Sequence, residues 1–553
     1  MAAVKRSINI LQYSVTNLKR GLFQKVSGKN NQCLQNYNYS TKRKIESLIT
    51  RVNGETIVRS PYEDVSLPQV SFAEYMFRKL EDFSDLVLMV DNTTGRPFTA
   101  RQLKEYSIKV ASALTKLGFK KGDRLLVFAN NCPEYSILFI ACSMLGVILS
   151  TANPVYTDGE LARQIIHSES SSIVTMPHLM PTVVKAVVSS KEVADSIKLI
   201  FCIGEYGGTL PFSLLMEDDG KAFPENIDIN PKEDILVLPY SSGTTGLPKG
   251  VMLSHYNLVS NLEQLIRGPM SHITAGKDSM IGILPFYHIY GLVVVQFGAA
   301  CSGAKLITLP KFEPEPFLQA IQQHKISYMH LVPPLALFMA KSPLVSNFDV
   351  RSVKNMVFGA APLGAGLTQE LMDRLGVNVL QGYGLTETSP VSNYDRSPPK
   401  VGSVGHFIPN TIGKVVHVET GETLGPGENG EIVLKGPQLM LGYLKNKSAT
   451  DDMIKNGWLY TGDIGHFDEE GYFIITDRLK ELIKYKGFQV APAELESLIC
   501  THPAVADVAV VGIQAAEDVG EVPKAYVVPK PNVSITEEDI IKFVEGIVSW
   551  TLY

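Results

Sequence analysis

Tyr240-Ser-Ser-Gly-Thr-Thr-Gly-Leu-Pro-Lys-Gly250 is the most informative stretch of this 553-residue chain. It follows an apolar run, Ile235–Leu238, that is typical of a buried strand, and it precedes a segment with helical periodicity near Asn257. Two internal glycines let the backbone turn sharply and bring N–H groups close to an anion. Four hydroxyl side chains add donors, and Lys249 adds a positive charge suited to a polyphosphate. The stretch is not a Walker A loop, because the GxxxxGK spacing is absent.

Short apolar runs alternate with amphipathic segments on both sides of this loop, which predicts an α/β fold with layered parallel sheets. The expected strands are Arg124–Ala129, Leu199–Ile203, Ile235–Tyr240, Ala304–Leu309 and Ser327–Leu331. The expected helices are Phe98–Leu117, Leu161–His167, Asn257–Arg267 and Pro316–His324. The run Ile137–Leu149 is too short to cross a membrane and predicts a buried helix.

The composition of the sequence changes near residue 400, where Gly and Pro become frequent. Strand-like segments at Glu431–Lys435 and Gly471–Asp477 predict a small β unit over about residues 400–477. Beyond Arg478 the pattern predicts a compact α+β unit, with a helix Pro492–Cys500, strands Asp507–Ile513 and Ala525–Val528, and a helix opened by Thr536. We therefore expect a large N-terminal domain over residues 46–477 and a small C-terminal domain over residues 478–553.

The formal net charge of −5 conceals a basic leader. Residues 1–45 contain nine Lys or Arg and no acid, so the remaining 42 basic and 56 acidic residues carry −14. This composition is typical of a transit peptide and favours mitochondrial import, with an untargeted extension and a cytoplasmic or peroxisomal location as alternatives. The mild charge gives no reason to expect a nucleic-acid partner. Six scattered cysteines without a CxxC pair predict reduced thiols in an intracellular protein.

Ser241–Gly250 resembles the phosphate loop of the adenylate-forming superfamily, which contains acyl-CoA synthetases, peptide-synthetase adenylation domains and beetle luciferases. Three further stretches match in the family's order. Gln381-Gly-Tyr-Gly-Leu-Thr-Glu387 resembles the adenine and magnesium motif, and Tyr460-Thr-Gly-Asp463 resembles the ribose motif. Asp477–Glu496 resembles the hinge and the start of a mobile C-terminal domain. This last stretch and Pro285–Gly291 look closest to 4-coumarate–CoA ligases and luciferases.

The resemblance implies an ATP site. The residues implied to bind ATP or AMP are Ser241, Ser242, Gly243, Thr244, Thr245, Gly246, Lys249, Gly359, Ala360, Ala361, Gln381, Gly382, Tyr383, Gly384, Thr386, Asp463, Arg478 and Lys484. Among them Thr386 is implied to contact the α-phosphate, Tyr383 to stack on adenine, and Asp463 to accept the ribose hydroxyls. Glu387 is implied to support Mg²⁺, a hard cation that prefers oxygen ligands. The implied catalytic set is His288, Thr386, Glu387, Arg478 and Lys484.

The resemblance also implies sites for coenzyme A and for a small carboxylic acid. Lys486 and Gly487 match the CoA-contacting turn, and Lys480 matches the hinge. His288 is implied to be a gate between the acyl pocket and the CoA tunnel. The implied acyl pocket contains Tyr290, Gly359, Gly384, Pro390 and Val391, which suit an aryl-propenoic or a fatty acid equally.

The sequence departs from the family at its end, Val548-Ser-Trp-Thr-Leu-Tyr553. Relatives continue into a segment ending in Pro-Lys-x-x-x-Gly-Lys, whose final lysine reaches the reacting carboxylate. We therefore expect a truncated, incomplete C-terminal domain and weakened adenylation, because removing one electrostatic contact to a transition state costs ~10²–10³ in rate.

The sequence favours an ATP-dependent acid–CoA ligase that forms an acyl-adenylate and then a thioester. A luciferase-like monooxygenase and a catalytically impaired nucleotide-binding isoform are the alternatives.

Overall fold

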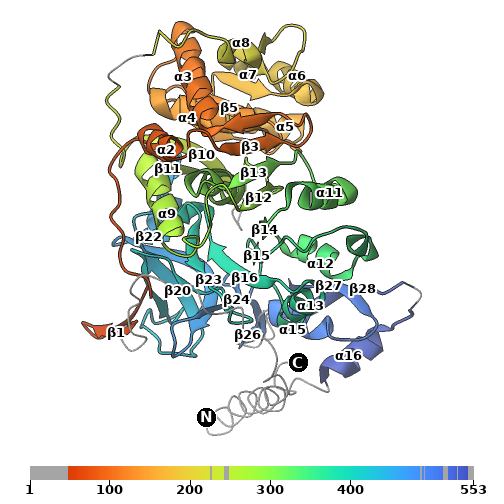
Figure 1. The fold of residues 1–553 in the computed structure, drawn as a ribbon. Helices are drawn as coiled ribbons and strands as arrows, with labels where there is room; N and C mark the ends of the chain where they lie inside the picture. Colours follow the sequence, from red (N-terminus) through yellow and green to blue (C-terminus); the bar gives the residue numbers. More distant parts are fainter. Residues whose placement is uncertain are drawn as a thin grey trace. The chain divides into compact units, whose positions relative to one another are not determined.

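The computed structural model describes residues 48–223, 227–241, 248–485, 488–490, 492–514, 521–531 and 533–545. All of them belong to one compact unit that begins at Arg43. The basic leader and the chain end at Ser549–Tyr553 lie outside the described residues. The α/β class predicted from the sequence is confirmed, with parallel strands at the centre of two large sheets (Figure 1).

The first large sheet has eight strands in the order β21-β11-β10-β6-β5-β7-β8-β9. Their bounds are β5 (Arg124–Phe128), β6 (Ile148–Thr151), β7 (Ser172–Thr175), β8 (Leu199–Cys202), β9 (Leu210–Pro211), β10 (Ile235–Ser241), β11 (Lys249–Ser254) and β21 (Gly442–Tyr443). The ladder is parallel from β10 to β9, whereas β11 and β21 are antiparallel additions. The glycine-rich loop therefore joins two antiparallel neighbours, β10 and β11, and the sequence pattern did not predict the second of them.

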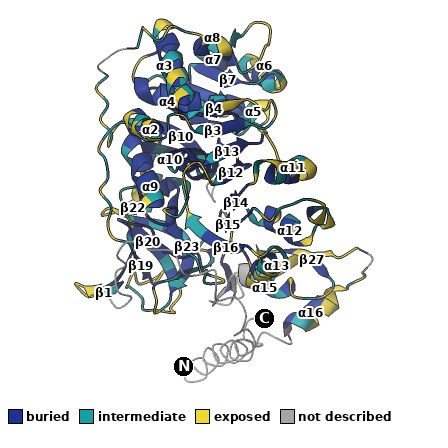
Figure 2. Ribbon diagram, in the orientation of Figure 1, coloured by how far each residue is buried: buried dark blue, intermediate teal, exposed yellow. Residues whose placement is uncertain are grey.

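Helices connect the strands of this first sheet (Figure 1). They are α3 (Ala100–Lys116), α4 (Pro133–Leu145), α5 (Asp158–Ser168), α6 (Met180–Val188), α7 (Lys191–Ser196) and α8 (Phe212–Met216). Figure 2 shows buried strands and helices such as α3, α5 and α6 with exposed outer faces, whereas α4 is buried almost throughout. The expected single helix Ile137–Leu149 is wrong, because α4 ends at Leu145, Gly146 takes the left-handed conformation (φ 67°), and the run continues as β6.

The second large sheet has nine strands in the order β18-β17-β16-β15-β14-β12-β13-β3-β4. Their bounds are β3 (Val87–Asp91), β4 (Pro97–Thr99), β12 (Ser279–Gly282), β13 (Lys305–Thr308), β14 (Tyr328–Leu331), β15 (Asn355–Phe358), β16 (Asn378–Gly384), β17 (Val391–Tyr394) and β18 (His406–Phe407). Its helical segments are α2 (Phe72–Asp82), α9 (His255–Arg267), the π-helix η3 (Tyr290–Phe297), α10 (Gly298–Cys301), α11 (Pro314–His324), α12 (Pro333–Lys341) and α13 (Ala365–Leu375).

Most expected elements are confirmed to within a few residues, and one boundary is corrected. The helix expected from Phe98 begins at Ala100, because Pro97–Thr99 pairs with β3 as strand β4. The Thr99 side chain then caps the helix, accepting a hydrogen bond from the Gln102 N–H at 3.2 Å.

A seven-stranded sheet forms the predicted β unit. Its path is β1-β2-β19-β20-β23-β22, with β24 paired to β23. The strands are β1 (Ile49–Val52), β2 (Glu55–Arg59), β19 (Ile412–Val416), β20 (Gly430–Lys435), β22 (Ile454–Lys455), β23 (Trp458–Phe467) and β24 (Phe473–Arg478), and α14 (Lys447–Met453) precedes β22. This sheet also takes in a hairpin from the beginning of the described chain, since β2 pairs with β19.

The C-terminal segment contains β25 (Ile483–Tyr485), β26 (Phe488–Val490), α15 (Pro492–Ile499), β27 (Val505–Gln514), β28 (Glu521–Pro529) and α16 (Glu537–Glu545). Its small core includes Ile483, Val490, Ile499, Val508 and Ile540. Thr536 and Asp539 exchange capping hydrogen bonds at the start of α16, as the sequence predicted.

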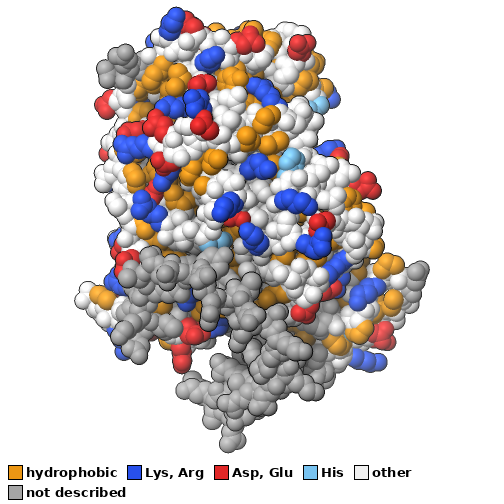
Figure 3. Space-filling view, viewed as in Figure 1, with side chains coloured by type: hydrophobic (Ala, Val, Ile, Leu, Met, Phe, Trp, Pro, Cys, Tyr) orange, Lys and Arg blue, Asp and Glu red, His pale blue; other side chains and the backbone are white. Residues whose placement is uncertain are grey.

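The outer surface carries both signs of charge. On the face drawn in Figure 3, basic and acidic side chains are interspersed. Among the residues that the structure describes, no helix combines the length and apolar character that a membrane crossing requires.

A buried amide ties α9 to the strand that carries Val391. The Asn261 side chain donates to the Val391 carbonyl at 2.9 Å and accepts from the Val391 N–H at 3.2 Å. Asn261 is fully buried, so water cannot replace either bond.

We expect Asn261→Leu to lower the free energy of unfolding by about 2–6 kcal/mol, because two buried backbone groups each lose a partner at ~1–3 kcal/mol. The matched control is Ser260→Ala, since the buried Ser260 hydroxyl has no hydrogen-bond partner among the described residues. Thermal unfolding measures both variants, and equal unfolding temperatures would contradict the assigned role of Asn261.

Candidate active site

Three of the predicted stretches follow the carboxyl ends of parallel strands in the second large sheet. The loops that follow β12, β15 and β16 contain Pro285–Gly291, Gly359–Pro362 and Leu385–Glu387, respectively. Because these strands run parallel, the three loops leave the sheet at the same edge. Ligands of open α/β sheets bind at such an edge.

The hairpin β10–β11 brings the two ends of the glycine-rich loop together. Ser241 and Lys249 lie directly opposite each other in the ladder. The intervening residues Ser242, Gly243, Thr244, Thr245 and Gly246 lie outside the described residues. Lys249 Nζ lies 4.9 Å from the centre of the Tyr443 ring.

Glu387 lies beside this hairpin, in the short helix η5 (Thr386–Thr388). Its side chain is only 6% exposed, and its Oε1 accepts hydrogen bonds from Tyr443 Oη at 2.7 Å and Ser241 Oγ at 3.1 Å. Thr386, the preceding residue, is half-buried. The structure thus brings together Ser241, Lys249 and Glu387, three of the predicted residues.

A second buried carboxylate lies between β16 and the β unit. Tyr383 Oη donates to Asp463 Oδ2 at 2.6 Å, and Arg478 Nε lies 3.7 Å from Asp463 Oδ1. Burial raises the pKa of Asp463, although the Tyr383 hydrogen bond and the Arg478 charge oppose the shift. Asp463 and Arg478 also face each other in the ladder between β23 and β24.

The loop after β15 is anchored by Gln381. Its Oε1 accepts from the Leu363 N–H at 2.9 Å, and the side chain is buried. The buried Gln381 side chain therefore anchors the loop, whereas Ala360 and Ala361 in the same loop are exposed. Ala360 has φ 70°, a left-handed conformation that is uncommon for a residue with a Cβ.

Tyr290 and Gly359 form the wall where an acyl pocket was predicted. A Cβ at Gly359 would lie 3.0 Å from Tyr290 Cε1, so only glycine lets this ring approach the loop. Tyr290 Oη lies 3.1 Å from His330 Nδ1. His330 is buried, and desolvation lowers its pKa to about 3, so the ring is neutral.

His288 lies at the start of this wall with an exposed side chain. Its Nδ1 accepts a hydrogen bond from the Tyr290 N–H at 3.3 Å, which leaves Nε2 to carry the proton in the neutral ring. Although the side chain reaches solvent, protein atoms surround most of the ring, and the resulting partial desolvation lowers the pKa of His288 and favours that neutral form.

Gly384 joins the predicted pocket to the predicted magnesium turn. A Cβ at Gly384 would lie 1.9 Å from the Pro390 carbonyl oxygen, and Leu385 N donates to the same oxygen at 3.1 Å. Pro390 and Val391 are both buried. Gly382, also predicted, pairs with Tyr394 across the β16–β17 ladder.

The C-terminal candidates are only partly described. Lys480 is exposed in the turn between β24 and β25, and Lys484 pairs with Gln489 in the β25–β26 ladder. Lys486 and Gly487 lie outside the described residues. Their predicted contacts with CoA stay predictions.

Sequence reasoning missed Tyr443 and His330. Tyr443 touches both Lys249 and Glu387, yet its stretch matches none of the four motifs quoted from the sequence. No local signal identifies either residue, because each contact depends on strand pairing between distant segments.

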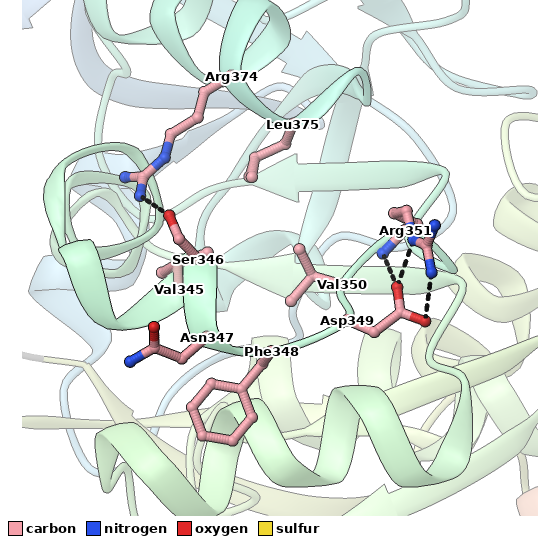
Figure 4. Close-up of a pocket in the computed structure, with 9 residues that line it drawn as sticks. All are labelled: Val345, Ser346, Asn347, Phe348, Asp349, Val350, Arg351, Arg374 and Leu375. Atoms are coloured by element: carbon pink, nitrogen blue, oxygen red, sulfur yellow. Dashed lines mark hydrogen bonds and ion pairs between the residues drawn. The ribbon is translucent and has the colours of Figure 1, made fainter.

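A separate pocket of about 480 Å³ lies near α13 (Figure 4). Its two arginines already have partners, since Arg351 Nε donates to Asp349 Oδ1 at 2.8 Å and Arg374 Nη2 donates to the Ser342 carbonyl at 2.7 Å. The nine lining residues include none of the predicted site residues.

Comparisons with known proteins agree with this architecture. The structure resembles ATP-bound MatB from Rhodopseudomonas palustris, with a TM-score of 0.78 and 28% identity, covering 87% of this chain and 93% of that chain. The fold is therefore that of an adenylate-forming enzyme, a large α/β domain followed by a small C-terminal one.

Two protein-family models match the chain. The AMP-binding enzyme model matches residues 76–444, and the AMP-binding enzyme C-terminal domain model matches residues 494–549. The chain therefore belongs to the AMP-binding enzyme family. It is 40% identical over 516 residues to probable 4-coumarate–CoA ligase 1 of Dictyostelium discoideum, covering 89% of this chain and 92% of that one. It is also 40% identical over 500 residues to 4-coumarate–CoA ligase 3 of Arabidopsis thaliana, covering 88% of each.

We expect Gly384→Ala to lower both the unfolding temperature and the thermal shift that ATP induces. The added Cβ overlaps the Pro390 carbonyl, so the β16–β17 turn that carries Glu387 must move. Gly366→Ala is the matched control, because a Cβ at Gly366 meets nothing within 4 Å and alanine favours helix α13. An ATP-induced shift in Gly384→Ala equal to that of the wild type would contradict the close contact.

Proposed function

We propose that this acid–thiol ligase of the AMP-binding family binds ATP between Lys249, Glu387, Tyr383 and Asp463 and activates a carboxylic acid there. Two groups of contacts support the proposal: Lys249 and Glu387 both contact Tyr443, and Tyr383 is hydrogen-bonded to Asp463. The charge of Glu387 also acts on Asp463, so the two groups are close to each other. The product is an acyl-adenylate, which coenzyme A then converts to a thioester.

The phosphates lie nearest to Lys249 in this proposal. A lysine ammonium is a compact charge suited to a polyphosphate, and Lys249 stands at the end of the loop whose glycines and hydroxyls were predicted to surround an anion. Thr386 lies in the turn beside it and is proposed to contact the α-phosphate.

Glu387 suits a magnesium ion that accompanies ATP. Magnesium prefers oxygen ligands and is commonly held by one or two carboxylates together with substrate phosphates. Both hydrogen bonds to Glu387 that involve described residues end on Oε1, which fixes the direction of the carboxylate. When bound, the metal would neutralise charge on the phosphates, and the role of Glu387 is to hold it.

The nucleoside lies against Tyr383 and Asp463. The Asp463 carboxylate can accept hydrogen bonds from the ribose hydroxyls, and the hydrogen bond from Tyr383 keeps it in place. The ring of Tyr383 offers a face for adenine, opposite the loop that contains Gly359, Ala360 and Ala361. Arg478 is close enough to Asp463 to reach the ribose and the α-phosphate.

The reaction proceeds in two balanced steps. A carboxylate oxygen of the acid attacks the α-phosphorus, the bond to the β-phosphate oxygen breaks, and pyrophosphate leaves. The CoA sulfur then attacks the acyl carbon, AMP leaves with the electrons of the acyl–oxygen bond, and the thiol proton passes to solvent. We place His288 at the mouth of the acyl pocket, Lys480 at the hinge, and Lys484, Lys486 and Gly487 on the C-terminal segment that approaches for these steps.

The acid that this pocket suits has an apolar or aromatic body. Tyr290, Pro390 and Val391 supply aromatic and aliphatic surface, and Gly359 leaves room for a flat ring beside Tyr290. Curated relatives that are 40% identical act on 4-coumarate by name, which supports an aryl-propenoic acid ahead of a fatty acid.

We expect acid-dependent exchange of labelled pyrophosphate into ATP, with 4-coumarate as the first acid and medium- and long-chain fatty acids as comparisons. Lys249→Met should reduce the exchange by ~10²–10³, the usual cost of removing one charge contact to a transition state. Lys354→Met is the control, because this exposed lysine pairs with Asp278 away from the site. The proposal would be overturned if the protein binds ATP but shows neither pyrophosphate exchange nor CoA-dependent AMP release with any of the acids.

We also expect adenosine affinity to fall as the pH is lowered, beginning above the ordinary aspartate range near pKa ~3.9. Burial raises the pKa of Asp463, so its carboxylate takes up a proton earlier on acidification and loses acceptor capacity. Asp463→Asn should bind adenosine more weakly at neutral pH and show a flat profile. Adenosine is used in calorimetry because it lacks titrating phosphates, and parallel pH profiles for the two proteins would contradict the assignment.

A further inference from the structure

The Tyr443 side chain contacts both the proposed phosphate lysine, Lys249, and the proposed metal carboxylate, Glu387. Its hydroxyl donates to Glu387 Oε1 at 2.7 Å, while Lys249 Nζ lies 4.9 Å above its ring. The side chain is only 6% exposed, so both interactions are largely shielded from water. Such shielding strengthens a charge-assisted hydrogen bond and a cation–π contact.

The backbone holds Tyr443 firmly in this position. Strand β21 pairs with β11, so Tyr443 lies opposite Val251, two residues beyond Lys249. On its other side the Tyr443 N–H donates to Thr450 Oγ1 at 2.9 Å, which fixes the strand to helix α14. The ring is thus fixed by two elements before any ligand binds.

The two contacts use different parts of one side chain. The phenolic O–H sets the direction of the Glu387 carboxylate together with Ser241, which donates to the same oxygen. The face of the ring attracts the Lys249 ammonium, an interaction that phenylalanine would retain.

We infer that Tyr443 is a positioning residue for the nucleotide site, one that holds Glu387 for the metal through its hydroxyl and Lys249 for the phosphates through its ring. This inference rests on the proposed function for the roles of Glu387 and Lys249. It adds a residue outside the recognised motifs and assigns separate duties to the ring and to the hydroxyl.

A purely structural role is the competing explanation. Tyr443 Oη also lies 2.8 Å from Met453 Sδ, and its ring packs in the main hydrophobic core. A structural role predicts loss of stability alone. A positioning role predicts in addition a change in how ATP binding depends on the divalent cation.

The test uses the full chain and two variants that separate the contacts. Tyr443→Phe removes the hydroxyl and keeps the ring, whereas Tyr443→Leu removes both. Thermal shifts induced by ATP are measured in EDTA and across a MgCl₂ series, with no acid or CoA present. Tyr394→Phe is the matched control, because it removes another buried phenol, which is hydrogen-bonded to Tyr328 at 2.5 Å.

In EDTA, we expect the ATP affinity of Tyr443→Phe to lie within about twofold of the wild-type affinity. The variant should need about tenfold more Mg²⁺ for the half-maximal thermal shift, because it loses one charge-assisted hydrogen bond. Tyr443→Leu should also bind ATP in EDTA about 2–30-fold more weakly, the range of a shielded cation–π contact. Tyr394→Phe should lower the unfolding temperature and leave the Mg²⁺ midpoint unchanged.

A double variant, Tyr443→Phe with Glu387→Gln, tests whether the Tyr443 hydroxyl acts through Glu387. If the hydroxyl acts through Glu387, adding Tyr443→Phe to Glu387→Gln changes the Mg²⁺ midpoint by less than about twofold. A wild-type midpoint in Tyr443→Phe, or full additivity in the double variant, would overturn the inference. Because these readouts need only ATP and Mg²⁺, they remain decisive even if no acid is ever activated, which is the separate failure of the proposed function.

Discussion

The proposed site depends on keeping two carboxylates in place with little water around them, beside the proposed position of a nucleotide that is itself an anion. Glu387 and Asp463 are 6% and 8% exposed, and each accepts a short hydrogen bond from a tyrosine hydroxyl, Tyr443 and Tyr383. Burying a carboxylate without a hydrogen-bond partner is costly. The two phenols, with Lys249 and Arg478 nearby, therefore help these side chains to line the proposed anion site.

Rigid elements supply this geometry. Glu387 lies in η5 and Asp463 in β23, and β16 links them, because it contains Tyr383 and leads directly into η5. Helix α9 strengthens the same region, because its buried amides bind the backbone of β17 and of the segment before β19. Preorganisation of this kind means that the ligand need not order the site when it binds.

The sequence predicted the α/β class and most strands and helices, since these are local features. The stretches assigned to the site stay predictions, although the structure does bring Ser241, Lys249 and Glu387 together. The sequence could not predict that Tyr383 donates to Asp463, because that bond joins residues 80 positions apart. Nor could it predict β11 or the addition of β1 and β2 to the β unit, because strand pairing is set by tertiary register rather than by periodicity. Tyr443 lacks a local signal for the same reason. The roles of Lys486 and Gly487 concern residues outside the described ranges and stay predictions.

The contact between Gly384 and the Pro390 carbonyl has a consequence for how this enzyme can diverge. The same backbone turn lines the wall of the proposed acid pocket and carries the carboxylate of the proposed metal site, so a shift of this turn changes both sites. Substitutions at Pro390 or Val391 that reshape the proposed pocket should therefore also move the turn that carries Glu387. The opposite wall is coupled to the proposed nucleotide site in the same way, because the Tyr290 ring packs against Gly359 while its hydroxyl contacts His330.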